Sequence, residues 1–153
     1  MSRFIAPYGI RFQQDGRLEL FPAVEVQILG SKKQGSRSLL HIDSGATISI
    51  LPAGDGELLD LDIDAGKKMA ILGIGGEPLL GFRHLVAVQI GGMKIKLLII
   101  FIDRLGIPRI LGREGVFNYF GIMFDESKRR TAFLDVRKER KAIDYLFSFS
   151  GNN

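Results

Sequence analysis

One short segment of the sequence has residue types that could carry out acid–base chemistry. Leu39-Leu40-His41-Ile42 is an apolar run, and Asp43-Ser44-Gly45-Ala46 follows it directly. An apolar strand delivers the residue at its end to a defined position, so Asp43 is predicted to be a fixed carboxylate. Ser-Gly-Ala permits a tight turn that brings backbone amides near that carboxylate, although many ordinary turns have this composition. A carboxylate held in this way can act as a general base.

Two segments further along the chain complete a set of three. Gly73-Ile74-Gly75-Gly76 lies between two apolar runs, which predicts the tip of a long hairpin. It is not a phosphate-binding Gly-x-Gly-x-x-Gly loop, because Pro78 stands at the third glycine position and a strand follows. Ile110-Leu111-Gly112-Arg113 is an apolar pair followed by glycine and a base, and it precedes a short helix predicted over Glu114–Phe120.

In this order the three segments resemble the retropepsin-like aspartic proteases, the single-lobed relatives of pepsin that include the retroviral proteases. The resemblance covers roughly Phe21 to Val136. Asp43–Ala46 is similar to the catalytic loop of that family, Gly73–Gly76 to its flap tip, and Ile110–Arg113 to the strand-to-helix element behind the catalytic loop. The resemblance implies an all-β, retropepsin-like acid protease fold, which is a closed, barrel-like single lobe with a flap hairpin and one short helix.

The number of loops of the Asp-Ser/Thr-Gly type decides how such an active site would be built. The sequence contains one Asp-Ser-Gly, and neither Asp103 nor Asp125 is followed by Ser-Gly or Thr-Gly. The chain is also too short for the two lobes of a pepsin. The resemblance therefore implies a symmetric homodimer in which each subunit contributes its Asp43 at the two-fold axis.

The resemblance also assigns a role to each segment of an aspartic endopeptidase. One Asp43 would take a proton from a bound water, while the other, protonated, would polarise the scissile carbonyl. Ser44 would hydrogen-bond across the axis, and Gly45 would let substrate approach the backbone. The flap amides near Ile74, Gly75 and Gly76 would bind an extended peptide or unfolded protein. Structural support would come from Ile110, Leu111, Gly112 and Arg113. Neither a cofactor nor a metal is expected.

One position departs from the pattern of the viral members. An acidic residue usually stands two positions after the loop glycine in that group, and here the position is Thr47. Arg113 must then find another partner, either Glu114 or a carboxylate of the other subunit. A hydroxyl at position 46 could hydrogen-bond the catalytic carboxylate, which Ala46 cannot do. We therefore predict activity at higher pH than in enzymes with Ser or Thr at this position.

Patterns of apolar residues predict the strands that position these segments. The alternating run Phe21–Leu29 and the apolar run Leu39–Asp43 are predicted to form a hairpin. Leu59–Asp64 alternates apolar residues with aspartate, which predicts a strand with one solvated face; its spacing does not match an EF-hand. Further hairpins are predicted from Lys68–Leu72 with Leu79–Ile90, from Leu79–Ile90 with Met93–Ile102 through Gly91-Gly92, and from Gly121–Phe124 with Thr131–Val136.

The ends of the chain lie outside the resemblance. We predict an N-terminal extension over residues 1–20, a protease domain over 21–136, and a charged and then aromatic tail over 137–153, for which a helix and a loose tail are equally open. Residues 128–141 hold seven basic and two acidic residues, while the rest is about neutral. Because no stacking aromatics alternate with these bases, we interpret them as a solvated face and expect no nucleic-acid partner.

Composition excludes several other classes of protein. The 153 residues are 46% hydrophobic and 25% charged, which is typical of a globular protein. The absence of cysteine excludes disulfides, thiolate catalysis and cysteine-ligated zinc. There is no apolar run of membrane-spanning length and no visible secretory signal, so we expect a soluble, cytoplasmic protein without a membrane partner.

A second function remains open beside the endopeptidase. A catalytically silent dimer of the same fold could bind peptides or proteins without cutting them. A buried pair of carboxylates costs stability, and a pure scaffold has no need to keep it, so Asp43 favours the protease. In either case the cleft is expected to have apolar walls, with Ile50, Leu72, Ile74 and Leu80 as candidate lining residues.

Overall fold

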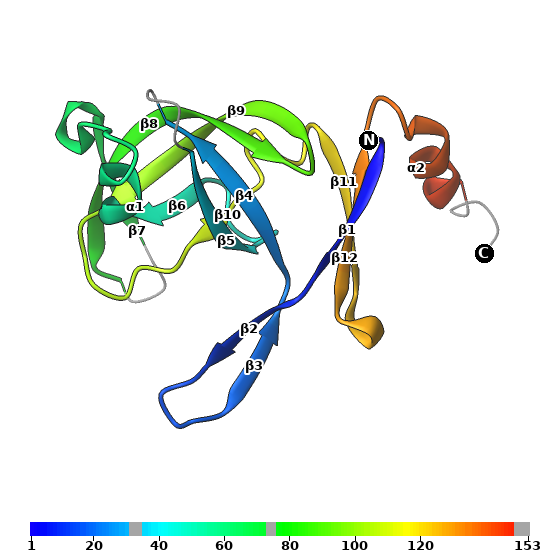
Figure 1. Ribbon diagram of the computed structural model, residues 1–153, viewed down its shortest axis with the longest axis horizontal. Helices are drawn as coiled ribbons and strands as arrows, with labels where there is room; N and C mark the ends of the chain where they lie inside the picture. The colour runs from blue at the N-terminus through cyan, green and yellow to red at the C-terminus, as the bar shows by residue number, and fades with distance from the viewer. Residues whose placement is uncertain (31–34, 73–75, 149–153) are drawn as a thin grey trace.

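The computed structural model describes residues 1–30, 35–72 and 76–148. Strands dominate the chain, as the sequence predicted (Figure 1). They are β1 (Arg3–Pro7), β2 (Gly9–Phe12), β3 (Leu18–Phe21), β4 (Ala23–Leu29), β5 (Ser36–Ile42), β6 (Ser49–Pro52), β7 (Lys67–Leu72), β8 (Pro78–Ile90), β9 (Met93–Ile102), β10 (Ile110–Leu111), β11 (Phe120–Asp125) and β12 (Arg130–Asp135). The helical elements are α1 (Ala53–Glu57), η1 (Ile63–Ala65), η2 (Glu126–Lys128) and α2 (Arg140–Phe147).

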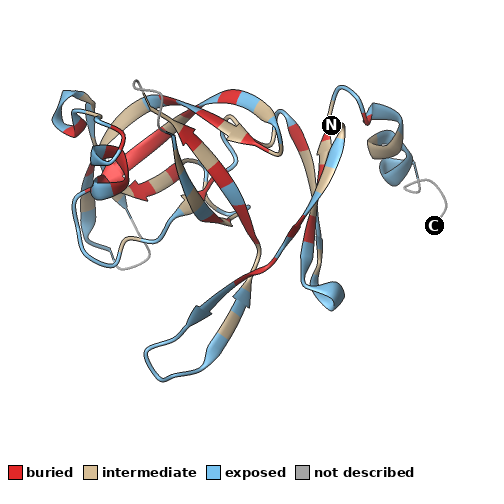
Figure 2. Ribbon diagram, viewed as in Figure 1, coloured by how far each residue is buried: buried red, intermediate tan, exposed pale blue. Residues whose placement is uncertain are grey.

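Six strands close into a barrel, which confirms the predicted closed, barrel-like lobe. The hydrogen-bonded order runs from β4 through β5, β10, β6, β9 and β8, and β8 pairs with β4 to complete the circle. β7 extends the sheet beyond β8. Along β4 alternate side chains face inward, and Val26 and Ile28 are fully buried. Leu40, Leu97 and Phe101 fill the same interior, which Figure 2 colours red.

The predicted hairpins are present, because turn chemistry is local. β4 pairs antiparallel with β5, β7 with β8, β8 with β9, and β11 with β12. Gly91 and Gly92 connect β8 to β9 with φ of +53° and +86°. A two-residue hairpin turn of the type that matches strand twist needs positive φ at both positions, which glycine adopts without steric cost.

The strand predicted over Leu59–Asp64 is wrong. This segment forms a turn after α1 and then the short helix η1. Asp60 has φ of +57°, which interrupts an extended backbone. Leu59 and Ile63 are still buried, and the Ile63 side chain lies over Gly56, where a Cβ atom would come within 2.5 Å of Ile63 Cδ1. The apolar residues therefore reach the core from a turn rather than from one face of a strand.

The helix predicted over Glu114–Phe120 is also wrong. Residues 114–119 form consecutive turns, and Phe120 already belongs to β11. Gly115 has φ of +76°, which breaks a right-handed helix, although Phe117 N still donates to Arg113 O (3.0 Å). The described part of the C-terminal segment does contain a helix, α2, so helix rather than loose tail describes residues 140–147.

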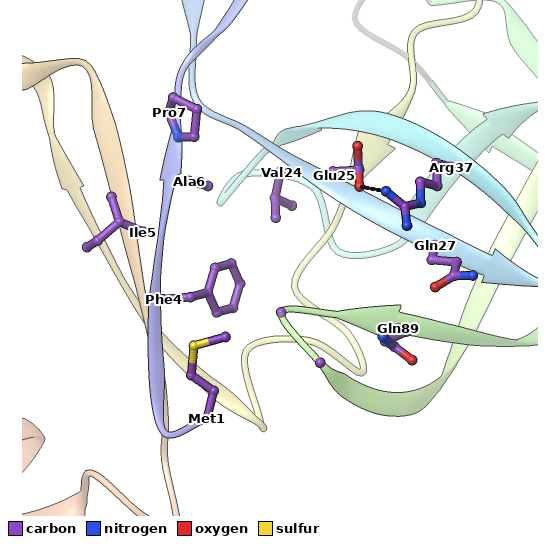
Figure 3. A pocket seen from close by; sticks show the side chains of 12 residues that line it. Met1, Phe4, Ile5, Ala6, Pro7, Val24, Glu25, Gln27, Arg37 and Gln89 are labelled. Atoms are coloured by element: carbon purple, nitrogen blue, oxygen red, sulfur yellow. Dashed lines mark hydrogen bonds and ion pairs between the residues drawn. The ribbon is translucent and has the colours of Figure 1, made fainter.

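A second, three-stranded sheet has the order β1-β12-β11. Phe4 of β1 stacks on Phe133 of β12 with ring centroids 4.6 Å apart, and Phe120 meets Phe133 edge to face at 5.6 Å. A groove of about 390 Å³ is lined by residues of β1, β4 and the β8–β9 turn. In Figure 3 Phe4 points into this groove, whereas Ile5 points to the opposite side of β1.

The basic residues near the C-terminus lie at both ends of β12 and do not form a continuous stripe. Four of them make ion pairs with acidic neighbours: Arg129 with Glu126, Arg130 with Asp125, Arg137 with Asp135, and Arg140 with Asp144. This pairing fits a solvated face. None of the described helices has the length and apolar character needed to cross a membrane.

Candidate active site

Strand β5 positions the Asp43 carboxylate. β5 lies in the barrel wall between β4, its antiparallel partner, and β10, its parallel partner. Immediately after the strand, Asp43 N donates to Leu111 O (3.1 Å). The amides of Gly45 and Ala46 donate to Asp43 Oδ1 at 2.8 and 3.2 Å. The side chain is half-buried, and Oδ2 accepts no hydrogen bond from the described residues, so one carboxylate oxygen is held and the other is available.

The element Ile110–Arg113 lies directly behind this loop, as the resemblance implied. Leu111 is fully buried, and Gly112 packs so closely on Ile48 that a Cβ atom would lie 2.5 Å from the Ile48 carbonyl carbon. Two backbone hydrogen bonds join the segments: Arg113 N donates to Ala46 O (2.9 Å) and Glu114 N to Thr47 O (2.8 Å). Main-chain hydrogen bonds therefore hold the active-site loop in place along this segment.

Arg113 does not form the ion pair expected within its own chain. Its Nη2 lies 3.5 Å from Thr47 Oγ1, at the limit of a hydrogen bond, and the side chain is exposed. Thr47 thus stands beside the arginine at the position where viral members have a carboxylate. The structure gives Arg113 no ion pair with Glu114 in the described part of the chain.

Sequence reasoning missed the buried hydroxyl of Ser49. Its Oγ accepts a hydrogen bond from Gly112 N at 3.0 Å, and the residue is fully buried. The bond links β6 to the glycine behind the active-site loop, across 63 residues of sequence. No local pattern could have revealed it, because serine in a strand is usually exposed.

Ser49→Ala is expected to lower the free energy of unfolding by roughly 1–3 kcal/mol, because Gly112 N is left buried without an acceptor. The matched control is Thr131→Val, since Thr131 Oγ1 is buried without a hydrogen-bond partner among the described residues. Removing that hydroxyl should be neutral or stabilising. Denaturant unfolding of the two variants measures both effects, and equal destabilisation would contradict the role given to Ser49.

A second missed interaction anchors the strand before Gly112. Asp55 of α1 is 6% exposed and accepts two hydrogen bonds from Arg109, at 2.6 and 2.7 Å. These hydrogen bonds raise the pKa of the Arg109 guanidinium. Arg109 O in turn accepts from His41 N (2.9 Å), so the ion pair fixes the approach of β10 to β5.

The loop lies at the edge of an apolar cleft of about 670 Å³. Its walls come from the active-site loop, β6, β7 and β9: Asp43, Gly45, Ala46, Thr47, Ile48, Ile50, Met69, Ala70, Ile71, Leu72 and Ile100. Of the predicted lining residues, Ile50 and Leu72 are present, whereas Leu80 of β8 is outside this set and 56% exposed. Ile74 and Gly75 lie outside the described residues, and Gly76 is exposed with φ of +77°.

Comparison with solved structures identifies the fold. A retropepsin-like aspartic protease from Rickettsia conorii superimposes with a TM-score of 0.56 over 86% of this chain and 92% of that chain. The chain has the retropepsin-like fold. The two sequences are 18% identical. Another solved structure, EIAV protease in complex with an inhibitor, superimposes with a TM-score of 0.49 at 25% identity, covering 64% of this chain and 86% of that one. No protein-family model and no curated protein matches the sequence.

Within the retropepsin-like fold, the Asp43 loop and the Ile110–Arg113 element occupy one region, because hydrogen bonds join them. β7 lines the same cleft up to Leu72, and most of the third segment, residues 73–75, lies outside the described residues. The family resemblance drawn from the sequence is confirmed at the level of the fold. The described chain provides one Asp-Ser-Gly carboxylate to this cleft.

Proposed function

We propose that the protein is an aspartic endopeptidase whose active site forms between two copies of the chain. The observation that carries the proposal is the Asp43 carboxylate, held by two amides at the edge of an apolar cleft in a single-lobed retropepsin-like fold. One such lobe supplies one catalytic aspartate, so a two-aspartate mechanism requires a second copy related by a two-fold axis.

The chemistry follows from bringing two carboxylates together. At a separation of about 3 Å both cannot be ionised, so they share one proton. The ionised Asp43 takes a proton from a water held between the two side chains, and that water attacks the peptide carbonyl. The protonated Asp43 of the other copy polarises the carbonyl oxygen, and a proton then passes to the leaving amine. No covalent intermediate is formed.

The loop leaves the required groups available for this arrangement. Asp43 Oδ1 is occupied by backbone amides, whereas Oδ2 is available for the water or the second carboxylate. The Ser44 hydroxyl is exposed and makes no side-chain hydrogen bond with the described residues of its own chain. This exposure supports a role for Ser44 as a hydrogen-bonding partner of the other copy across the axis.

The cleft favours extended substrates with apolar side chains. Most of the side chains in its walls are aliphatic or methionine, among them Ile48, Ile50, Met69 and Ile71. β7 is the last strand in the hydrogen-bonded order of the barrel sheet, so one edge of this strand has no partner strand within the described sheet. An extended peptide can add to such an edge through main-chain hydrogen bonds, while the walls bind alternate side chains. The β7–β8 hairpin then serves as the flap over the peptide.

Cleavage of casein across about pH 3 to about pH 7, with dimerisation followed by sedimentation, tests the proposed function. We expect cleavage that depends on the dimer. A stable monomer at all concentrations that still cleaves casein would contradict the two-chain active site.

Ala46→Ser is expected to move the acidic limb of the pH–rate profile to lower pH. The added hydroxyl can donate a hydrogen bond to the carboxylate beside it, and such a bond favours the ionised form. Ala46→Val is the control, because it adds bulk without a donor. The profile of kcat/KM against pH measures the shift. An optimum in strong acid that Ala46→Ser leaves unchanged would contradict the prediction.

A further inference from the structure

The hairpin of β2 and β3 projects from the rest of the molecule (Figure 1). We call residues 9–21 the arm. Its strands pair from Gly9 with Phe21 to Phe12 with Leu18, and Gln13 N donates to Arg17 O (2.7 Å) to close the tip. A two-stranded hairpin is marginally stable in water unless one of its faces packs on something else.

The two faces of the arm differ in what they contact. The strand register places Ile10, Phe12, Leu18 and Leu20 on one face, and these side chains are 60%, 76%, 56% and 38% exposed. On the opposite face Arg11 donates two hydrogen bonds to Glu19, at 2.6 and 3.0 Å, and its guanidinium lies 5.0 Å from the Phe21 ring. The polar face is satisfied within the arm, whereas the apolar face is uncovered.

No described segment of the chain covers this apolar face. A hollow of about 400 Å³ separates the arm from Arg129 in the β11–β12 turn, and Leu18 and Leu20 line it. Figure 2 shows the arm as almost entirely exposed or half-exposed beyond its base. Four large apolar side chains gathered on one exposed face are typical of an interaction surface.

The base of the arm lies beside the active-site loop. Pro22, the residue after the arm, accepts a hydrogen bond at its carbonyl from Ile42 N (2.9 Å), and Asp43 is the next residue. The ring of Phe21, the last residue of β3, lies 5.2 Å from the ring of His41 in β5. The arm thus begins about one strand spacing, roughly 5 Å, from β5, the strand that directly precedes Asp43.

We propose that the arm packs its apolar face against a second copy of this chain. The inference rests on the proposed function, in which Asp43 lies at the two-fold axis of a dimer. An arm that starts beside that axis and points away from its own barrel extends toward the other copy. The two-fold symmetry makes the contact reciprocal, so each copy provides one arm and receives one. A peptide would cover the face only while bound, whereas the copy that completes the active site covers it permanently.

The first test measures the dissociation constant of the dimer by sedimentation equilibrium. The double substitution of the cross-strand pair, Phe12→Ser with Leu18→Ser, is expected to raise this constant by roughly 100-fold, as loss of two interface anchors does. Arg11→Ser is the matched control, because it removes an ion pair from the opposite face and leaves the apolar face intact. Thermal unfolding of both variants checks that the barrel is unchanged, which is expected because the substituted side chains are exposed.

The second test measures directly whether the apolar face of the arm is buried, and it does not depend on weakening the dimer. The chain contains no cysteine, so a single introduced cysteine provides the only thiol that can react. The thiol of Leu18→Cys should react with iodoacetamide several-fold more slowly above the dimer dissociation constant than below it. The thiol of Arg11→Cys, on the opposite face, should react at the same rate under both conditions.

The outcomes distinguish a failure of the arm contact from a failure of the proposed function. Weaker dimers in the double variant together with a protected thiol at position 18 support the inference. An unchanged dimer with an unprotected thiol overturns the arm contact, while Asp43-dependent cleavage by that dimer leaves the endopeptidase intact. Protection only when casein is added would assign the face to substrate and overturn the inference. A wild-type chain that is monomeric at every concentration overturns both the arm contact and the two-chain active site.

Discussion

Asp43→Asn is expected to reduce casein cleavage by roughly 10³-fold or more, because an amide can neither accept the water's proton nor share a proton with the second carboxylate. The fold and the dimer should be retained. The side-chain oxygen of asparagine can still accept the hydrogen bonds from Gly45 N and Ala46 N, which keeps the loop in place. Initial rates of casein cleavage, with sedimentation as a check on assembly, measure the effect.

Asp103→Asn is the matched control, since it makes the same chemical change at an exposed aspartate outside the Asp-Ser-Gly loop. Its activity should equal that of the wild type. Cleavage that survives Asp43→Asn would rule out an aspartic mechanism. A stable wild-type dimer that cleaves nothing at any pH would instead favour a peptide-binding module of the same fold.

Mixing wild-type chains with Asp43→Asn chains tests whether the active site is shared between two copies. A shared active site needs an Asp43 from each copy, so a mixed dimer of wild type and Asp43→Asn should be inactive. In an equal mixture that exchanges subunits freely, about one quarter of the dimers have two aspartates, and activity per wild-type chain should fall by about half. Activity that stays proportional to the wild-type chain would show that each copy works alone.

Gly112→Ala is expected to have the second-largest effect, through packing. A Cβ atom at this position would lie 2.5 Å from the carbonyl carbon and 2.6 Å from the carbonyl oxygen of Ile48. Both are main-chain atoms of the active-site loop segment, so the clash cannot be relieved by a side-chain rotation. The loop or β10 must shift, and we expect a loss of about 1–3 kcal/mol in the free energy of unfolding together with most of the activity.

Gly54→Ala provides the control for this substitution. Gly54 lies in α1, and a Cβ atom there would have no neighbour within 4 Å. Alanine at this position should leave stability unchanged or raise it by about 0.5–1 kcal/mol, because glycine loses more backbone freedom in a helix. Urea unfolding and casein cleavage of both variants are the measurements. Wild-type stability and activity in Gly112→Ala would contradict the close packing.

The two wrong predictions of secondary structure have a common cause. Leu59–Asp64 has the alternation of a strand, and Glu114–Phe120 has a composition compatible with a helix. In the folded chain Asp60 and Gly115 both adopt positive φ, which ends the regular backbone that each pattern predicts. Leu59 and Ile63 are apolar because they pack onto the core. The periodicity of apolar residues does not reveal whether they reach the core from a strand or from a turn.

The sequence by itself determined the features that depend on neighbouring residues. These are the hairpins, the Gly91-Gly92 turn, and the apolar strand that directly precedes Asp43, because turn geometry and strand alternation are properties of a few consecutive residues. The tertiary structure alone decided which distant groups support the site. Only the closed barrel brings together the Ser49 hydroxyl with Gly112 N, and Asp55 with Arg109. Only the strand register gathers the apolar side chains of the arm on one face. Hydrogen bonds and packing between distant segments depend on chain topology, which no local pattern encodes.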